Sequence, residues 1–179
     1  MKKYDSTKIK NIAIAGHAGS GKTSLTEALL FKSGATDRLG KVLDGNTVSD
    51  YYPDEISRKC SVYTSLSSLE TAGGFKVNLL DTPGLFDYEG EEIEGIFASG
   101  CVLITVSAKS GVKVGTHKAY EYAKAMGKPA VFVVTKLDDD NANFNNVLTE
   151  LKSEFGPTVC PVVVPVIAER KIVSYVNLI

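Results

Sequence analysis

The stretch GHAGSGKT, residues 16–23, decides how this chain folds. It matches the pattern G-x-x-x-x-G-K-[ST], in which backbone N–H groups surround phosphate oxygens while the lysine and the hydroxyl serve the terminal phosphates and Mg²⁺. A short buried strand over residues 11–15 precedes it, and apolar spacing predicts a helix over residues 22–32. The loop therefore has the context of a phosphate-binding loop, and its expected binding residues are Gly16, His17, Ala18, Gly19, Ser20, Gly21, Lys22, Thr23 and Ser24.

Two further motifs follow in order, Asp81-Thr82-Pro83-Gly84 and Thr135-Lys136-Leu137-Asp138. Asp81 is expected to hold Mg²⁺ through a water, and the turn at Pro83 and Gly84 offers a glycine N–H to the γ-phosphate. In the motif Thr135–Asp138, the carboxylate of Asp138 would accept hydrogen bonds from N1–H and the 2-amino group of guanine. Lys136 would lie over the base, and Thr135 would brace the loop. Adenine has no matching pair of donors, so the three motifs predict GTP and GDP, with Mg²⁺, rather than ATP.

Length, charge and cysteine usage exclude several classes of protein. The 179 residues suit one domain, and 20 Lys plus Arg against 21 Asp plus Glu leave no basic surface for independent DNA binding. The three cysteines, Cys60, Cys101 and Cys160, lack the spacing of a zinc site, so we expect no metal other than Mg²⁺. The polar N-terminus and the absence of a long apolar run predict a soluble, cytoplasmic protein without a membrane partner.

Alternating strand and helix patterns predict an α/β fold of the P-loop NTPase class. We expect a mostly parallel sheet with helices on both faces, one antiparallel strand and a C-terminal β-hairpin. The patterns predict a first hairpin of strands 62–70 and 75–80, and two further strands at 101–107 and 130–135. They also predict three further helices, at 88–98, 116–126 and 141–155, and a final hairpin of strands 159–167 and 171–178. Residues 33–60 show no periodicity and are interpreted as a long functional loop.

The ordered motifs resemble those of the translational GTPases, most closely the N-terminal G domain of elongation factor G and its paralogues, including the tetracycline-resistance ribosomal protection proteins. The similarity runs through GHAGSGKTSLTEALL, the tract from Asp44 to Val62, DTPG with Asp87, SAKSGV and TKLD, and so spans nearly the whole chain. It implies a large multidomain factor that hydrolyses GTP and has the ribosome as its partner.

The resemblance also assigns roles to residues of this chain. It aligns Ser61 with a threonine whose hydroxyl closes over Mg²⁺ in the GTP state. The residues expected to act in catalysis are then Lys22, Gly84 and Ser61, and those expected to bind the metal are Thr23, Ser61 and Asp81.

Domain boundaries follow from the same resemblance. Residues 1–158 would form the G domain, and residues 159–179 would be the start of an inserted subdomain or a terminal β-hairpin. The family's last guanine-contacting Ser-Ala loop follows the base-reading motif, whereas Ser107-Ala108 precedes it. We therefore expect that loop to lie beyond Ile179 and the chain to be a truncated G domain.

Three positions depart from the family pattern. Leu85 stands where the family has a histidine that positions the attacking water, and an aliphatic side chain cannot hydrogen-bond water. Gly19 and Thr135 replace an aspartate and an asparagine, and neither His17 nor His117 is expected to substitute for the missing histidine. The leading hypothesis is a GTPase with slow, partner-stimulated hydrolysis. The alternatives are a non-hydrolysing GTP-binding regulatory module and, less favoured, a phosphate-loop ATPase or kinase.

Overall fold

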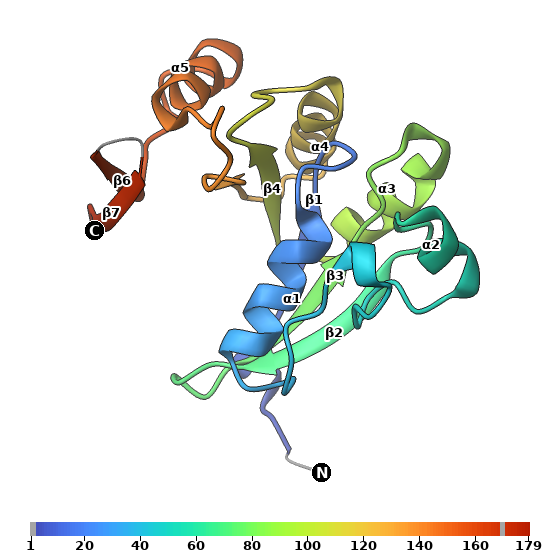
Figure 1. Ribbon diagram of the computed structural model, residues 1–179. Helices are drawn as coiled ribbons and strands as arrows, with labels where there is room; N and C mark the ends of the chain where they lie inside the picture. Colours follow the sequence, from blue (N-terminus) through green and yellow to red (C-terminus); the bar gives the residue numbers. More distant parts are fainter. Residues whose placement is uncertain (1–2, 169–170) are drawn as a thin grey trace.

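Five strands form the central sheet of the computed structural model, which describes residues 3–168 and 171–179 (Figure 1). The strand order is β2-β3-β1-β4-β5, and all neighbours are parallel except β2 and β3. The strand bounds are Ser65–Glu70 for β2, Lys76–Asp81 for β3, Ile9–Ala15 for β1, Cys101–Ser107 for β4 and Ala130–Thr135 for β5. This arrangement confirms the predicted mostly parallel sheet with one antiparallel strand.

Strand register brings the motifs to one edge of the sheet. Ile14, near the end of β1, pairs with Asp81 on β3 and with Leu103 on β4. On the other side of β4, Ser107 pairs with Thr135 at the end of β5. Loops that leave the carboxyl ends of neighbouring parallel strands meet at that edge, which is where α/β sheets bind ligands.

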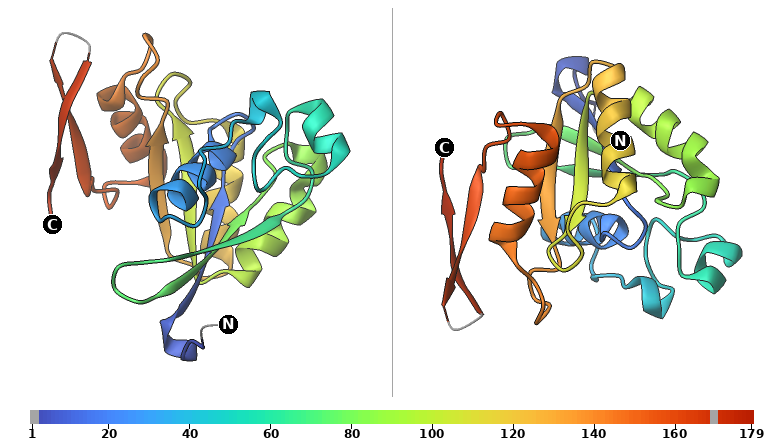
Figure 2. Two further views of the ribbon diagram at one scale, coloured as in Figure 1. Left: turned by 60° about the horizontal axis from the view of Figure 1, so that its bottom comes forward. Right: turned by 90° about the horizontal axis from the view of Figure 1, so that it is seen from above.

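Helices cover both faces of the sheet, as the sequence predicts (Figure 2). The helix α1 (Lys22–Lys32) packs Leu30 against Ile14 and Leu79 on one face. On the opposite face the core is formed by α3 (Glu89–Ala98), α4 (Val114–Ala125) and α5 (Phe144–Phe155). Because α1 begins directly after the glycine-rich loop, packing of its apolar side fixes the end of that loop against the sheet.

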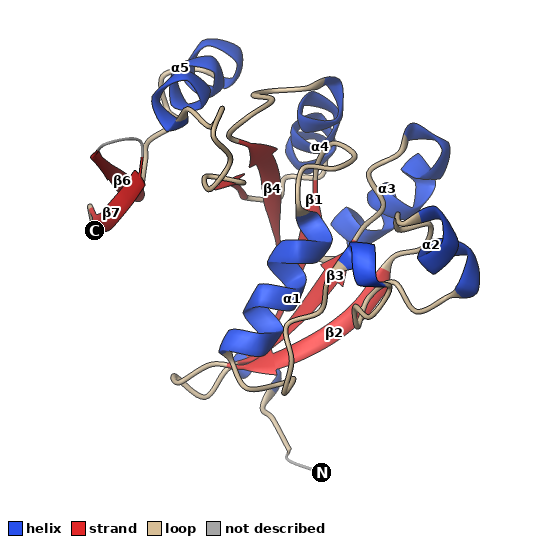
Figure 3. Ribbon diagram, in the orientation of Figure 1, coloured by secondary structure: helices blue, strands red, loops and turns tan. Residues whose placement is uncertain are grey.

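The tract 33–60 is not only a loop (Figure 3). It contains the short 3-10 helix η2 (Val42–Asp44) and the helix α2 (Pro53–Arg58), and a further 3-10 turn, η3 (Phe86–Tyr88), precedes α3. The helix α2 has proline and two acidic residues in its first turn, and the residue that caps its C-terminus, Lys59, has a φ of 54°. Six residues are too few to show helical periodicity, and this is why the sequence pattern missed α2.

The C-terminal hairpin is confirmed as a separate two-stranded antiparallel sheet of β6 (Val163–Ala168) and β7 (Lys171–Asn177). It lies beyond α5, away from the central sheet, in both views of Figure 2. Two residues of its expected turn, Glu169 and Arg170, lie outside the described part of the chain. Among the described residues, no helix has both the length and the apolar character that a membrane crossing requires.

Candidate functional site

The glycine-rich loop takes a backbone path that side chains would block. Gly16 has a φ of 129°, and a Cβ there would lie 2.8 Å from the carbonyl oxygen of Thr105. Gly21, with a φ of 96°, turns the chain into α1. The N–H groups of the first turn of α1 have no acceptor within the helix, and the positive end of the helix dipole adds to their attraction for anions.

Side chains from three other elements brace the loop from behind. The hydroxyl of Thr135, at the end of β5, donates to the carbonyl oxygen of Ser20 at 2.5 Å. The hydroxyls of Ser20 and Thr105 lie 2.6 Å apart, and Glu92 on α3 accepts the N–H of Gly16 at 3.0 Å. Thr135, which stands where the related pattern has asparagine, thus ties the end of β5 to the glycine-rich loop.

Lys22 is folded into the loop. Its side chain is 6% exposed, and its ammonium donates to the carbonyl oxygens of Gly16 at 2.9 Å and His17 at 3.1 Å. Burial lowers the pKa of Lys22, and the negative charges of nearby carboxylates, most strongly that of Asp81, oppose this effect. A Cβ at Gly84 would clash with this ammonium and lie 2.9 Å from the nitrogen of Ala18. A glycine is therefore required where the turn after β3 meets the glycine-rich loop.

Two buried carboxylates next to Lys22 lack partners. Asp81 is 1% and Asp50 is 4% exposed, and none of their four carboxylate oxygens has a hydrogen bond within the described residues. Burial raises the pKa of Asp81 to about 6, against the opposing effects of the Lys22 ammonium and of the nearby Thr23 and Ser49 hydroxyls. Burial also raises the pKa of Asp50, against the effect of the nearby Ser61 hydroxyl. Unpaired buried carboxylates are costly, and an arrangement of this kind favours a bound cation.

The hydroxyls expected at the metal site meet directly beside these carboxylates. Thr23 Oγ1 and Ser61 Oγ lie 3.2 Å apart, although 38 residues separate them in the sequence. No cluster of three or more histidine, cysteine or acidic side chains suited to a metal is found in the described part of the chain. Two hydroxyls and few carboxylates fit Mg²⁺, which retains waters and phosphate oxygens as ligands. Asp50 was not predicted, since an aspartate in a tract without periodicity carries no signal of burial.

One cleft connects the three motifs. It has a volume of about 760 Å³, within the usual range for small-molecule sites. Its walls come from the glycine-rich loop and α1, the tract 39–61, the turn after β3 and the loop after β5, and its lining includes Gly19, Gly21, Lys22, Thr23, Ser24, Asp50, Ser61, Gly84, Leu85 and Lys136. Leu85, 38% exposed, forms part of the rim where the related pattern has histidine.

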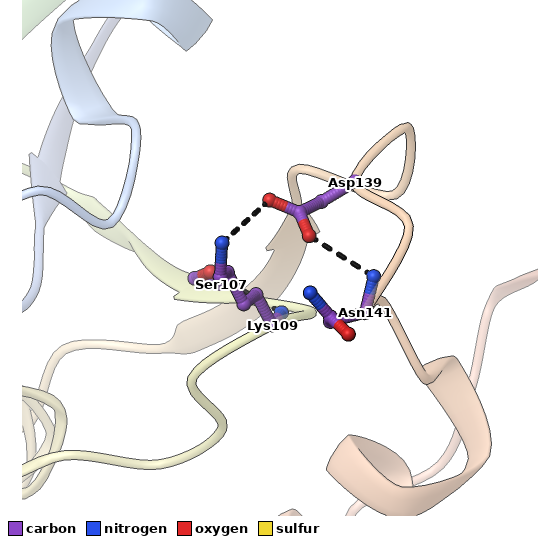
Figure 4. Close-up of polar contacts among 4 residues, drawn as sticks. All are labelled: Ser107, Lys109, Asp139 and Asn141. Atoms are coloured by element: carbon purple, nitrogen blue, oxygen red, sulfur yellow. Dashed lines mark hydrogen bonds and ion pairs between the residues drawn. The ribbon is translucent and has the colours of Figure 1, made fainter.

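The three consecutive aspartates after β5 have different surroundings. Asp139 accepts from the Lys109 ammonium and from the N–H of Asn141, both at 3.0 Å (Figure 4). Asp138 is exposed, and its carboxylate has no hydrogen bond among the described residues. Lys136, with a φ of 54°, lines the cleft, whereas Asp138 lies outside the lining. Asp140 is exposed as well, so Asp139 is the paired carboxylate of the three, and Asp138 is the unpaired one that belongs to the Thr135–Asp138 motif.

The histidines lie apart from the metal-binding groups. The ring centre of His17 is 6.0 Å from that of Phe86. Burial lowers the pKa of His17, and the positive charge of Lys22 lowers it further. His117, on α4, packs against Phe155 with ring centres 5.0 Å apart. Neither side chain lines the large cleft.

A family model and several known proteins each match most of this chain. The model of the family described as the elongation factor Tu GTP binding domain matches residues 7–176. An elongation factor G-like protein of Thermotoga maritima is 39% identical over 171 residues, which cover 96% of this chain and 24% of that protein. A mitochondrial ribosome-releasing factor 2 of Culex quinquefasciatus is 33% identical over 171 residues, 96% of this chain and 23% of that protein.

A solved structure shares the fold. The crystal structure of a Thermus thermophilus protein superimposes with a TM-score of 0.89 and 40% identity, covering 96% of this chain and 26% of that one. The chain thus spans about a quarter of the length of these relatives.

Proposed function

The chain belongs to the family of elongation factor Tu GTP binding domains, and from this premise we propose that it is the GTP-binding switch domain of an elongation factor G-like translation GTPase. In this proposal the full-length protein hydrolyses GTP to GDP and phosphate in connection with the ribosome, in the cytoplasm, and does so slowly. The observation that supports it best is the single cleft lined by Lys22, Ser61, Gly84 and Lys136 together.

Binding of the triphosphate depends on the glycine-rich loop. The Lys22 ammonium exchanges the carbonyl oxygens of Gly16 and His17 for oxygens of the β- and γ-phosphates. The N–H groups at the start of α1 and that of Gly84 donate to the same phosphates. The backbone donors are held in place by the fold before the substrate arrives, and once Lys22 has exchanged its partners, little further reorganisation is needed as charge develops during the reaction.

The residues that would hold Mg²⁺ are Thr23, Ser61 and Asp81, with Asp50 next to them. When bound, Mg²⁺ neutralises charge on the β- and γ-phosphates. Asp81 and Asp50 must be ionised for this, and the positive ion removes the penalty of their burial.

Base selection is assigned to the loop after β5. Asp138 accepts from the two donors of guanine, and the stem of Lys136 covers the face of the ring. With adenine the carboxylate would be desolvated without partners, so discrimination is expected to reach a few kcal/mol.

Leu85 supports the proposal of slow hydrolysis. Its side chain can neither donate to nor accept from the attacking water, so water positioning is left to other groups of the full-length protein or of its partner, the ribosome. The same observation favours a second candidate, a GTP-binding module that changes conformation without hydrolysing GTP.

The test is single-turnover GTP hydrolysis by the full-length protein, with and without ribosomes. We expect a slow basal rate that ribosomes raise. Rapid hydrolysis without ribosomes would contradict the role given to Leu85, and no hydrolysis under either condition would favour the second candidate. Displacement of labelled GTP by ATP as effectively as by GTP would instead favour an ATPase or kinase.

A further inference from the structure

Glu55 is a buried carboxylate to which the sequence motifs assign no role. It lies on α2, is 1% exposed, and accepts three backbone N–H groups. Its Oε1 accepts from Val62 at 3.0 Å and from Tyr63 at 3.1 Å, while Oε2 accepts from Tyr52 at 3.3 Å. A buried carboxylate with this many partners fixes the backbone around it, because breaking any of these bonds leaves a charge without compensation.

The segment that Glu55 fixes carries Ser61. The N–H groups of Val62 and Tyr63 belong to the two residues directly after Ser61, and the N–H of Cys60, directly before it, donates to the carbonyl oxygen of Glu55 at 3.3 Å. Ser61 is therefore held on both sides by one residue. Its hydroxyl lies 3.2 Å from that of Thr23 on α1, which is the contact expected of two ligands of one metal ion.

A second buried carboxylate anchors the same tract elsewhere. Glu27 on α1, 1% exposed, accepts the N–H groups of Gly40 at 3.0 Å and Val48 at 2.6 Å. These contacts attach the first half of the tract to α1 but lie at least 13 residues before Ser61. The position of the Ser61 hydroxyl thus depends on Glu55 rather than on Glu27.

We propose that Glu55 is a positioning residue that holds the Ser61 hydroxyl where it can bind Mg²⁺ in the GTP complex, an inference that rests on the proposed function. Glu55→Gln keeps the size of the side chain and one acceptor oxygen. Its neutral oxygen, however, would hold the N–H groups of Val62 and Tyr63 more weakly than the carboxylate does, and its amide nitrogen would face the N–H of Tyr52, donor against donor. The backbone around Ser61 then loosens, while the phosphate loop and Asp138 are unchanged.

The experiment measures retention of a fluorescent, non-hydrolysable GTP analogue during a Mg²⁺ titration, using the whole chain. For Glu55→Gln we expect the half-maximal Mg²⁺ concentration to rise on the order of tenfold, with analogue affinity in EDTA and Mg²⁺ dependence of GDP binding both within about twofold of wild type. Glu150→Gln is the control for the loss of a carboxylate–backbone bond as such, because the exposed Glu150 accepts one backbone N–H, that of Val112 at 2.9 Å, and does not line the cleft. It should behave as wild type.

A double-mutant cycle with Ser61→Ala separates positioning from general loosening. If Glu55 acts through Ser61, Glu55→Gln should add little to the effect of Ser61→Ala. Additive effects, an unchanged Mg²⁺ requirement, or equal losses with and without Mg²⁺ would overturn the inference. If Glu55→Gln does not fold, Glu55→Asp, which shortens the reach of the carboxylate, decides by the same measurement. Failure of the wild-type protein to bind the analogue with Mg²⁺ would instead overturn the proposed function.

Discussion

Replacing Asp81 by asparagine should stabilise the protein at pH 8 in the absence of nucleotide and Mg²⁺. Burial raises the pKa of Asp81 from 3.8 to about 6, and this value already includes the favourable effect of the Lys22 ammonium. A carboxyl group whose pKa is higher in the folded than in the unfolded protein binds more protons when folded. Stability therefore falls as the pH rises from about 4 to about 6, and the full penalty persists above that range.

The size of the effect follows from the shift. Roughly two pKa units, at about 1.4 kcal/mol each, give a penalty of about 3 kcal/mol at pH 8 for the ionised carboxylate. Asparagine removes this penalty but buries an amide in the same place, where the neighbouring Thr23 and Ser49 hydroxyls can satisfy only part of its hydrogen bonding. A net gain of about 1 to 2 kcal/mol in the free energy of unfolding is expected, because an unsatisfied amide carries a cost of its own.

Urea unfolding of wild type and Asp81→Asn in EDTA, at pH 8 and pH 5, measures this difference. At pH 5, near the middle of the range over which the penalty develops, about half of it remains, and the cost of the buried amide offsets this remainder, so the two proteins should be about equally stable. With GTP and Mg²⁺ at pH 8 the order should reverse, because only the wild type gains stability from metal-dependent binding. A variant that is less stable at pH 8 without ligands, or equally favoured at both pH values, would refute the reasoning.

Three further substitutions test other parts of the site. Gly84→Ala should weaken GTP binding on the order of tenfold in an equilibrium titration, because its Cβ would displace the nitrogen of Ala18; unchanged affinity would contradict this. Leu85→His should raise the ribosome-stimulated single-turnover rate roughly a hundredfold, with unaltered GTP affinity, and an equal rate would show that catalysis does not depend on this position. Asp138→Ala should lower GTP affinity on the order of a hundredfold and leave ATP binding unchanged. Asp139→Ala is its control, since Asp139 is already paired.

Much of the fold was predictable from the sequence because two of its central strands, β4 and β5, are nearly continuous apolar runs. β4 and β5 coincide with the expected ranges 101–107 and 130–135, and α1 with 22–32. Parallel strands covered on both faces produce such runs, and the glycine-rich loop fixes where β1 ends and α1 begins. The phosphate and base-reading motifs were equally visible, since their chemistry depends on residue type at fixed spacing.

The buried acidic residues outside the three motifs were not predictable. Glu92 stands among Glu89, Glu91 and Glu94 in a helix that reads as a solvated acidic surface, yet it is 7% exposed and accepts the N–H of Gly16. Glu55 lies in a helix too short to show periodicity. Burial of such groups is decided by tertiary contacts with backbone N–H donors, and local sequence does not record them.

The central claim is that the cleft binds guanine nucleotide, with the phosphates on the glycine-rich loop and the base at Asp138. A crystal structure of the chain with a non-hydrolysable GTP analogue and Mg²⁺ tests it most directly. The account predicts phosphate oxygens within hydrogen-bond distance of the Lys22 ammonium, the metal next to Thr23 and Ser61, and the guanine edge on the Asp138 carboxylate. Nucleotide bound elsewhere, or Asp138 turned toward solvent while the nucleotide is in place, would contradict it.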